Sequence, residues 1–121
     1  MAKAEFNNIR LELDKIMAPY ATKLDSKIDE DGNLHVDTKY IRENGKPLYF
    51  GSVIARKHSV AFHLMPVYVN PALLDSASPE LKKLMRGKSC FHFTSGTMNL
   101  LSELKSLTKS GFEDYKEKGY V

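Results

Sequence analysis

Residues 48–65 decide the fold of this chain, and they read LYFGSVIARKHSVAFHLM. Val, Ile, Phe and Tyr dominate both ends of the stretch and favour strands on a pleated, partly buried surface. The polar run at 56–59 lies between them and gives the chain a place to reverse. We therefore predict a β-hairpin with Lys57 and His58 as its two turn residues. This turn pairs Val53 with Phe62 across the hairpin.

Both faces of the predicted hairpin are apolar. The face that carries Val53 and Phe62 is assigned to the core. We call the opposite face, which carries Ser52, Ile54 and His63, the second face. It is too apolar to be left open to water in an antiparallel sheet, so we expect it to be covered or to bind something. The pocket candidates on it are Phe50, Ser52, Ile54, His63 and Met65.

The chain before the hairpin shows first a helical and then an extended pattern. Apolar residues from Phe6 to Tyr20 recur at steps of three and four, which predicts a helix with one buried stripe. Pro19 is expected to break that helix near its end. Residues 24–28 and 34–40 alternate, and Asp31-Gly32 between them favours a tight turn, so we predict two strands.

The chain after the hairpin returns to helical spacing twice. Ser78 and Pro79 are typical of a helix start, and Gly87 is typical of a helix end. Residues 88–93 alternate and predict a strand, and from Thr97 a C-terminal helical region follows, with Gly111 as a bend or break. We thus predict an α+β fold, with an antiparallel sheet of about five strands packed by an N-terminal helix and C-terminal helices. The whole chain, residues 1–121, should form one domain.

Composition limits the compartment and the partners. The chain has one cysteine, which excludes an intramolecular disulfide, and the charged residues among its first twenty do not fit a signal peptide. No apolar run approaches the roughly 18 residues of a membrane span. We expect a cytoplasmic protein without a membrane partner.

The net charge of +3 comes from 18 basic and 15 acidic residues spread along the chain. Nucleic acid is therefore not expected as a partner, which leaves an unknown small ligand or protein and an open oligomeric state.

Cys90, His92 and His63 are the candidate metal ligands. Cys90 and His92 are two residues apart on a predicted strand, and a neighbouring strand can bring His63 to the same face. Thiolate and imidazole are ligands that zinc prefers. We favour the other interpretation, in which Cys90 is buried without metal as a small apolar side chain and the histidines form local hydrogen bonds, at least one of them within the protein. We predict no cofactor, with iron or zinc as the alternative.

Four basic residues form a second candidate site, this time for an anion. Arg56 and Lys57 lie at the hairpin turn, and Arg86 and Lys88 flank Gly87. Two such pairs can clamp an anion if the turn and the Gly87 connection are close in space. Alternatively, Arg86 and Lys88 only complement the negative end of the preceding helix.

Two stretches resemble the YdhG-like family of small bacterial cytoplasmic α+β domains. They read YFGSVIARKHSVAFHLMPVY at 49–68 and SPELKKLMRGKSCFHF at 78–93. The resemblance extends over about residues 48–115 and is most specific at 79–81 and 87–91. The family has no agreed activity, but some members are described as frataxin-like iron chaperones, which bind iron through acidic side chains on a helix and an adjoining strand edge. The resemblance implies that the iron ligands would come from Glu5, Glu12, Asp14, Asp25, Asp29, Glu30 and Asp31.

The pattern as a whole favours a binding function. The chain contains no glycine-rich phosphate loop, no His-Glu-x-x-His motif and no Gly-x-Ser-x-Gly turn. A Cys–His nucleophile pair lacks an identifiable orienting partner. We expect a non-enzymatic domain that binds a ligand or a partner on the second face. The alternative is a frataxin-like iron or other metal-handling protein, and the third hypothesis is an enzyme of unknown type.

Overall fold

Alternating apolar residues build one antiparallel sheet, and two amphipathic helices cover one of its faces. The computed structural model describes residues 3–30 and 33–121. The strands are β1 (Asp25–Glu30), β2 (Asn33–Ile41), β3 (Pro47–Ala55), β4 (Val60–Leu64) and β5 (Cys90–Phe93), and their order in the sheet is β1-β2-β3-β4-β5. The α-helices are α1 (Lys3–Lys23), α2 (Met65–Val69), α3 (Pro79–Lys82) and α4 (Leu101–Glu117), and the 3-10 helices are η1 (Pro71–Ser76) and η2 (Ser95–Leu100). The predicted α+β fold is confirmed.

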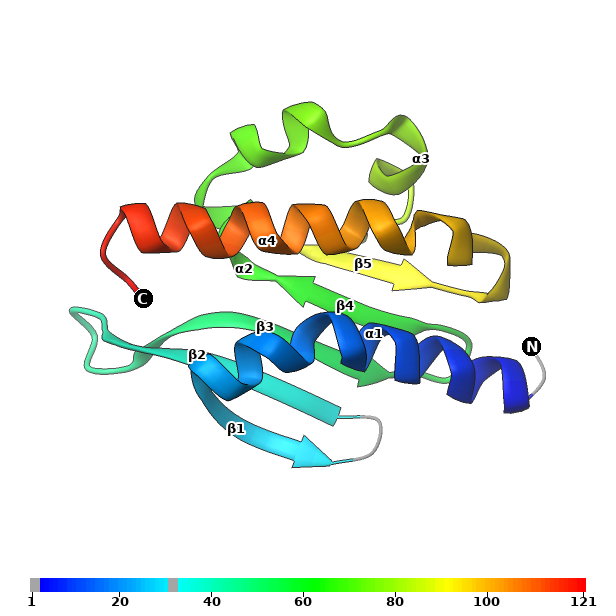
Figure 1. The fold of residues 1–121 in the computed structure, drawn as a ribbon, viewed down its shortest axis with the longest axis horizontal. Helices are drawn as coiled ribbons and strands as arrows, with labels where there is room; N and C mark the ends of the chain where they lie inside the picture. The colour runs from blue at the N-terminus through cyan, green and yellow to red at the C-terminus, as the bar shows by residue number, and fades with distance from the viewer. Residues whose placement is uncertain (1–2, 31–32) are drawn as a thin grey trace.

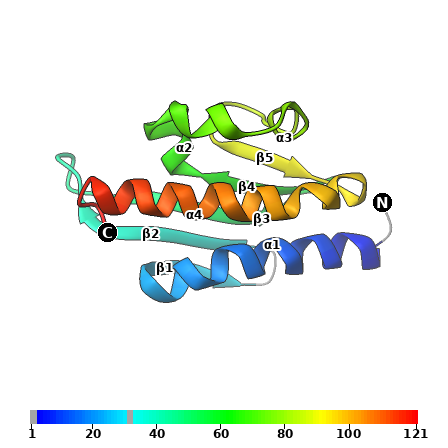
Figure 2. The same cartoon turned by 45° about the horizontal axis from the view of Figure 1, so that its top comes forward.

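The helices lie on one side of the sheet. Figure 1 shows α1 and α4 next to each other in front of the strands, with α2 at the end of β4 close to α4 and with η1 and α3 beyond the β5 edge. Figure 2 shows the same layering from a second direction. In both views the described helices lie on the side of α1 and α4 or beyond β5, and no described helix is placed on the second face.

The predicted hairpin has the predicted register. Val53 pairs with Phe62 and Ala55 with Val60, and the Arg56 N–H donates to the Ser59 carbonyl across the turn. β3 and β4 each have a neighbour on both sides, so the hairpin lies inside the sheet, as its two apolar faces predicted.

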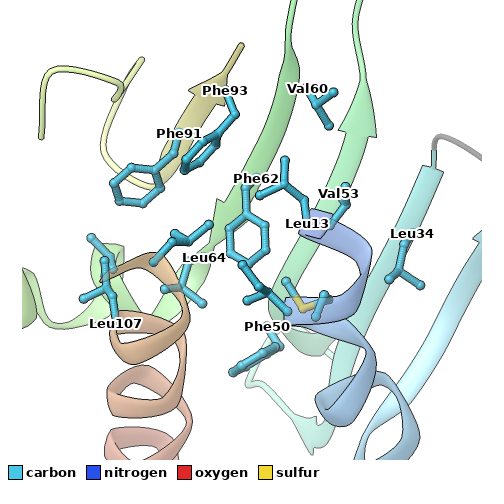
Figure 3. Close-up of a cluster of buried hydrophobic side chains, with 14 of the residues drawn as sticks. Leu13, Leu34, Phe50, Val53, Val60, Phe62, Leu64, Phe91, Phe93 and Leu107 are labelled. Atoms are coloured by element: carbon cyan, nitrogen blue, oxygen red, sulfur yellow. The ribbon is translucent and has the colours of Figure 1, made fainter. Parts of the chain in front are cut away.

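The core lies between the hairpin and the helices (Figure 3). Ile9, Leu13 and Met17 from the α1 stripe are almost completely buried against it. The stripe therefore packs on the sheet as its spacing predicted. Figure 3 shows the Phe62 ring at the centre of the labelled side chains.

Pro19 does not end the first helix, which continues to Lys23. Pro19 lacks only the hydrogen bond to the carbonyl four residues earlier, and it is exposed, where water can satisfy that carbonyl. The Ile16, Met17 and Tyr20 side chains on either side of it still pack on the core. Packing of the apolar stripe therefore outweighs the loss of one bond.

The helix predicted to run from Ser78 to Gly87 is much shorter. Ser78 is its N-cap and accepts a hydrogen bond from the Leu81 N–H, as predicted, but α3 ends at Lys82. The next residues pair with the edge of β5: the Arg86 N–H donates to the Cys90 carbonyl, and the His92 N–H donates to the Leu84 carbonyl. Gly87, with φ +83°, therefore belongs to a tight turn instead of closing a helix.

Gly111 does not break the C-terminal helix. α4 runs through it without interruption. A Cβ at this position would lie 2.9 Å from the Pro66 Cβ, so the glycine lets α4 pack closely against α2. The prediction of a bend was wrong because the glycine has a packing role.

Of the helices that the structure describes, none is long and apolar enough to cross a bilayer.

Candidate functional site

A row of polar side chains crosses the second face of the sheet. His35 on β2 pairs with Ser52 on β3, Ser52 with His63 on β4, and His63 with Cys90 on β5. Residues that face each other in an antiparallel sheet point to the same side. The next row holds Ile54, Ala61 and His92. The sequence prediction that Ser52, Ile54 and His63 share the second face agrees with this register.

A β-bulge adds Tyr49 to this face. Val36 pairs with Gly51 and the next residue, Asp37, pairs with Tyr49, so Phe50 is an extra residue on β3. A bulge reverses the alternation of the strand, which turns Tyr49 to the second face and Phe50 to the core. The assignment of Phe50 to the pocket is therefore wrong: it is fully buried and packs edge-on against Tyr115, with ring centroids 5.9 Å apart.

Met65 was also predicted to line the second face as a strand residue. It is the first residue of α2, beyond the last residue of β4, Leu64. Pro66 at the start of α2 has no N–H to continue the ladder and has the φ angle of a first helical turn. The chain therefore leaves the sheet before Met65.

The bulge is held from the helix side of the sheet. The Tyr115 hydroxyl on α4 donates to the Tyr49 carbonyl at 2.9 Å. Gly51 lets β3 approach its neighbours, because a Cβ there would lie 2.6 Å from the His63 carbonyl oxygen and 2.6 Å from the Met17 methyl carbon. The position of Tyr49 thus depends on core contacts from two helices.

Tyr49, His35, His63 and Ser52 form a cluster on the second face. The Tyr49 ring stacks on His35 with centroids 4.6 Å apart, and its centroid is 6.4 Å from that of His63. Its hydroxyl hydrogen-bonds with the Ser52 hydroxyl, and Ser52 is fully buried although no described helix covers it. Burial raises the pKa of Tyr49 to about 12, with Asp37 and Cys90 adding to the rise and the Ser52 bond opposing it. The phenol therefore stays neutral and can donate a hydrogen bond at physiological pH.

Three members of the site were missed in the sequence: His35, Asp37 and Tyr49. His35 and Asp37 are two apart on β2, and their side chains are joined by a bond of 3.0 Å between Nε2 and Oδ1. Their alternation with Leu34 and Val36 was visible and would have placed both on the second face. For Tyr49 the available signal was Gly51, because a glycine inside a strand often marks a bulge.

Cys90, His92 and Ser59 form the β5 side of the site. The Cys90 Sγ lies 3.4 Å from the His92 Nε2, and the His92 Nδ1 lies 3.1 Å from the Ser59 hydroxyl. Burial raises the pKa of the Cys90 thiol, and the charge of Arg56 opposes part of that rise. The expectation that Cys90 is buried and that a histidine forms a hydrogen bond inside the protein is confirmed.

The structure brings the three candidate metal ligands to one face without bringing them to one point. Cys90 contacts His92, and His63 lies opposite Cys90 on the next strand. Among the residues described, no three His, Cys, Asp or Glu side chains are placed to hold one ion.

The acidic side chains suggested for iron have other partners where they are described. The Glu12 carboxylate bonds with Lys15, and that of Asp14 bonds with Arg10. Glu5 is exposed in the first turn of α1. Asp31 lies outside the described residues, as do the side chains of Asp25, Asp29 and Glu30.

The two basic pairs lie at opposite ends of the β4–β5 ladder. The turn of Arg56 and Lys57 precedes Val60, which pairs with Phe93, whereas the 86–88 turn leads into Cys90 at the other end. The Lys88 ammonium lies 5.9 Å from the centroid of the Tyr68 ring on α2, and Lys57 is exposed in the turn. Lys57 and Lys88 therefore do not join the two arginines in a single clamp of four residues. Neither Arg86 nor Lys88 caps a helix, because α3 has already ended at Lys82.

Burial and nearby positive charge lower the pKa of two histidines of the site, which favours their neutral form. The pKa of His63 is lowered by burial first, and then by Arg56, His92 and His35. The pKa of His92 is lowered by burial first, and then by Arg86 and Arg56.

We expect His63 to make the fold less stable in mild acid. A histidine whose folded pKa lies below its unfolded value of about 6.5 binds a proton more readily in the unfolded chain. Its contribution is therefore complete above that value and is lost as the pH falls through it. The free energy of unfolding should be lower at about pH 5 than at about pH 7.5, and His63→Asn should reduce this difference. Urea denaturation at both pH values measures it, with His58→Asn in the exposed turn as the control; an equal acid loss in both variants would contradict the expectation.

Two grooves lie away from the second face, at the C-terminal end of α4. One has a volume of about 450 Å³ and the other about 330 Å³, and Tyr40 and Tyr120 line both. The centroids of these two rings are 4.8 Å apart. None of the residues predicted for the site lines either groove.

Fold and site together define a class: a small α+β domain whose five-stranded antiparallel sheet has helices on one face and a polar, aromatic site on the other. No family model matches the chain, and no curated protein and no solved structure matches it. The resemblance to the YdhG-like family therefore stays a prediction.

Proposed function

We propose that this protein is a non-enzymatic binding domain that holds a small ligand on the second face of its sheet. The observation that supports this most directly is the cluster of Tyr49, His35 and His63 over Ser52. Half-buried rings with a few fixed polar groups are typical of small-molecule sites. A bulge held from two helices gives the cluster a preformed geometry.

The same geometry argues against the other two functions. An enzyme that used Cys90 as a nucleophile would need a thiolate, and burial raises the pKa of this thiol. A metal-handling protein would need ligands free to converge, whereas the His92 Nδ1 already bonds with Ser59 and the carboxylates of Glu12 and Asp14 bond with basic neighbours. The free thiol of Cys90 fits the reducing conditions of the cytoplasm, which we propose as the compartment.

The test is an NMR titration with four ring probes of different charge: phenol, benzylammonium, benzoate and phenyl phosphate. We expect at least one probe to shift the backbone amides around Ser52, His63 and His92. Tyr49→Ala should weaken this binding by roughly 3- to 10-fold, since an aromatic contact contributes about 0.5–1.5 kcal/mol. The dissociation constants come from the same titrations.

Tyr68→Ala is the matched control, because Tyr68 is an exposed tyrosine on α2. It should leave the binding of the probes unchanged. If no probe shifts the second-face amides, or if the shifts gather at Tyr40 and Tyr120 instead, the proposed function is wrong.

A further inference from the structure

Arg56 brings a positive charge to the β3 end of the second face. It follows Ile54 by two residues and hydrogen-bonds through its N–H to Ser59, whose hydroxyl contacts His92. It lies at the start of the turn and is exposed. Strand alternation places it on the same face as Ile54, and its charge acts on His63, Cys90 and His92 of that face.

Arg86 brings a second positive charge from the opposite edge. Its N–H donates to the Cys90 carbonyl, and Met85 forms a bridge with Phe91. Arg86 is therefore opposite Cys90 in an antiparallel pair, and opposed residues share a face. This pairing places Arg86 beside His92, whose pKa it lowers more than Arg56 does.

These two charges are not neutralised within the part of the chain that the structure describes. Neither Arg56 nor Arg86 forms a salt bridge with a described residue. Among the described side chains of the site, Asp37 carries the carboxylate. It bonds with His35 at the β2 end of the site and not with either arginine. The β4–β5 half of the second face therefore carries an uncompensated positive charge.

Building on the proposed function, we propose that the ligand carries a carboxylate or phosphate group that binds between Arg56 and Arg86, next to His92 and Ser59. A guanidinium presents paired N–H donors that match the oxygen atoms of either group. The ring of the ligand then lies toward Tyr49 and His63. The same field disfavours a cation at Cys90 and His92, which separates this site from a metal site.

The anion site uses two of the four basic residues that the sequence singled out. Arg56 and Arg86 are retained because Arg86 pairs with Cys90, next to His92 on β5, and Arg56 pairs with Ser59, whose hydroxyl contacts His92. Lys57 is exposed in the turn, and Lys88 extends over Tyr68 on α2, so neither is assigned to the anion. Arg86 joins the site because residues 84–86 pair with β5, and no local pattern in the sequence indicated this pairing.

The test compares the dissociation constants of the four ring probes. Benzoate and phenyl phosphate should bind at least about 10-fold more tightly than phenol, and benzylammonium should bind most weakly. The double variant Arg56→Gln with Arg86→Gln should bring both anions to the affinity of phenol. The ratio of benzoate to phenyl phosphate binding then tells a carboxylate ligand from a phosphate ligand.

A second double variant, Lys57→Gln with Lys88→Gln, removes the same net charge and serves as the control. It should keep the preference for anions. An equal loss in both double variants would show a general charge effect and overturn the proposal. So would phenol or benzylammonium binding at the second face as tightly as the anions, but then the proposed function would stand. All four replaced residues are exposed, and unchanged thermal melts of both variants would show that folding is intact.

Discussion

Phe62→Ala is expected to lower the free energy of unfolding by about 3–5 kcal/mol. Phe62 is fully buried at the centre of the core and lies on β4, which is paired on both sides (Figure 3). Neighbours on both adjacent strands are fixed by the ladder, Val53 on β3 and Phe91 on β5. They cannot move into the space that the ring leaves, so a cavity remains. The cost of this cavity adds to the lost transfer free energy of the ring.

Urea denaturation followed by circular dichroism measures this loss. Ile41→Ala is the control: it removes an apolar side chain that is 58% exposed, at the end of β2. Its effect should stay within about 0.5 kcal/mol, as is usual for surface positions. A loss below about 1 kcal/mol for Phe62→Ala would contradict the burial of this ring at the centre of the core.

Gly51→Ala is expected to lower the free energy of unfolding by about 1–3 kcal/mol and also to weaken binding at the second face. The added Cβ would lie 2.6 Å from both the Met17 methyl carbon and the His63 carbonyl oxygen. The end of the Met17 side chain can rotate away. The carbonyl belongs to the neighbouring strand and can move only if the β3–β4 ladder is distorted. Because Gly51 adjoins the bulge, that distortion would also displace Tyr49.

The stability of this variant is measured by denaturation and its binding by the titration with phenyl phosphate. Gly96→Ala is the matched control, since a Cβ there would meet nothing within 4 Å and its φ angle is not in the left-handed region. It should be neutral or slightly stabilising, because alanine restricts the unfolded chain more than glycine does. If the two variants are equally stable, Gly51 does not mark a close approach of the backbone.

Half of the candidate site follows from local pattern. Ser52, Ile54 and His63 were placed on one face because a two-residue turn sets the register of the hairpin, and register sets the face of every residue in both strands. Cys90 and His92 were placed together by the same alternation on the next strand. These relations need only neighbouring residues and one turn.

The positions of Tyr49 and Arg86 follow from contacts between distant segments. Phe50 and Tyr49 exchange faces at a bulge that depends on Tyr115, which is 66 residues away from Tyr49 along the chain. Arg86 reaches the site because residues 84–86 satisfy the backbone groups of the β5 edge instead of continuing a helix. Local propensity favoured the helix, but the unpaired edge of β5 competes for the same backbone.

The sequence by itself determined the α+β class, the register of the central hairpin and the buried stripe of the first helix, because side-chain periodicity and turn chemistry act over a few residues. Only the tertiary structure decided that the second face stays without a described helix, that Tyr49 joins it and that residues 84–86 pair with the edge of β5. Each of these features depends on contacts of backbone groups and apolar surfaces that are distant in the sequence. The periodicity of the sequence does not reveal such contacts.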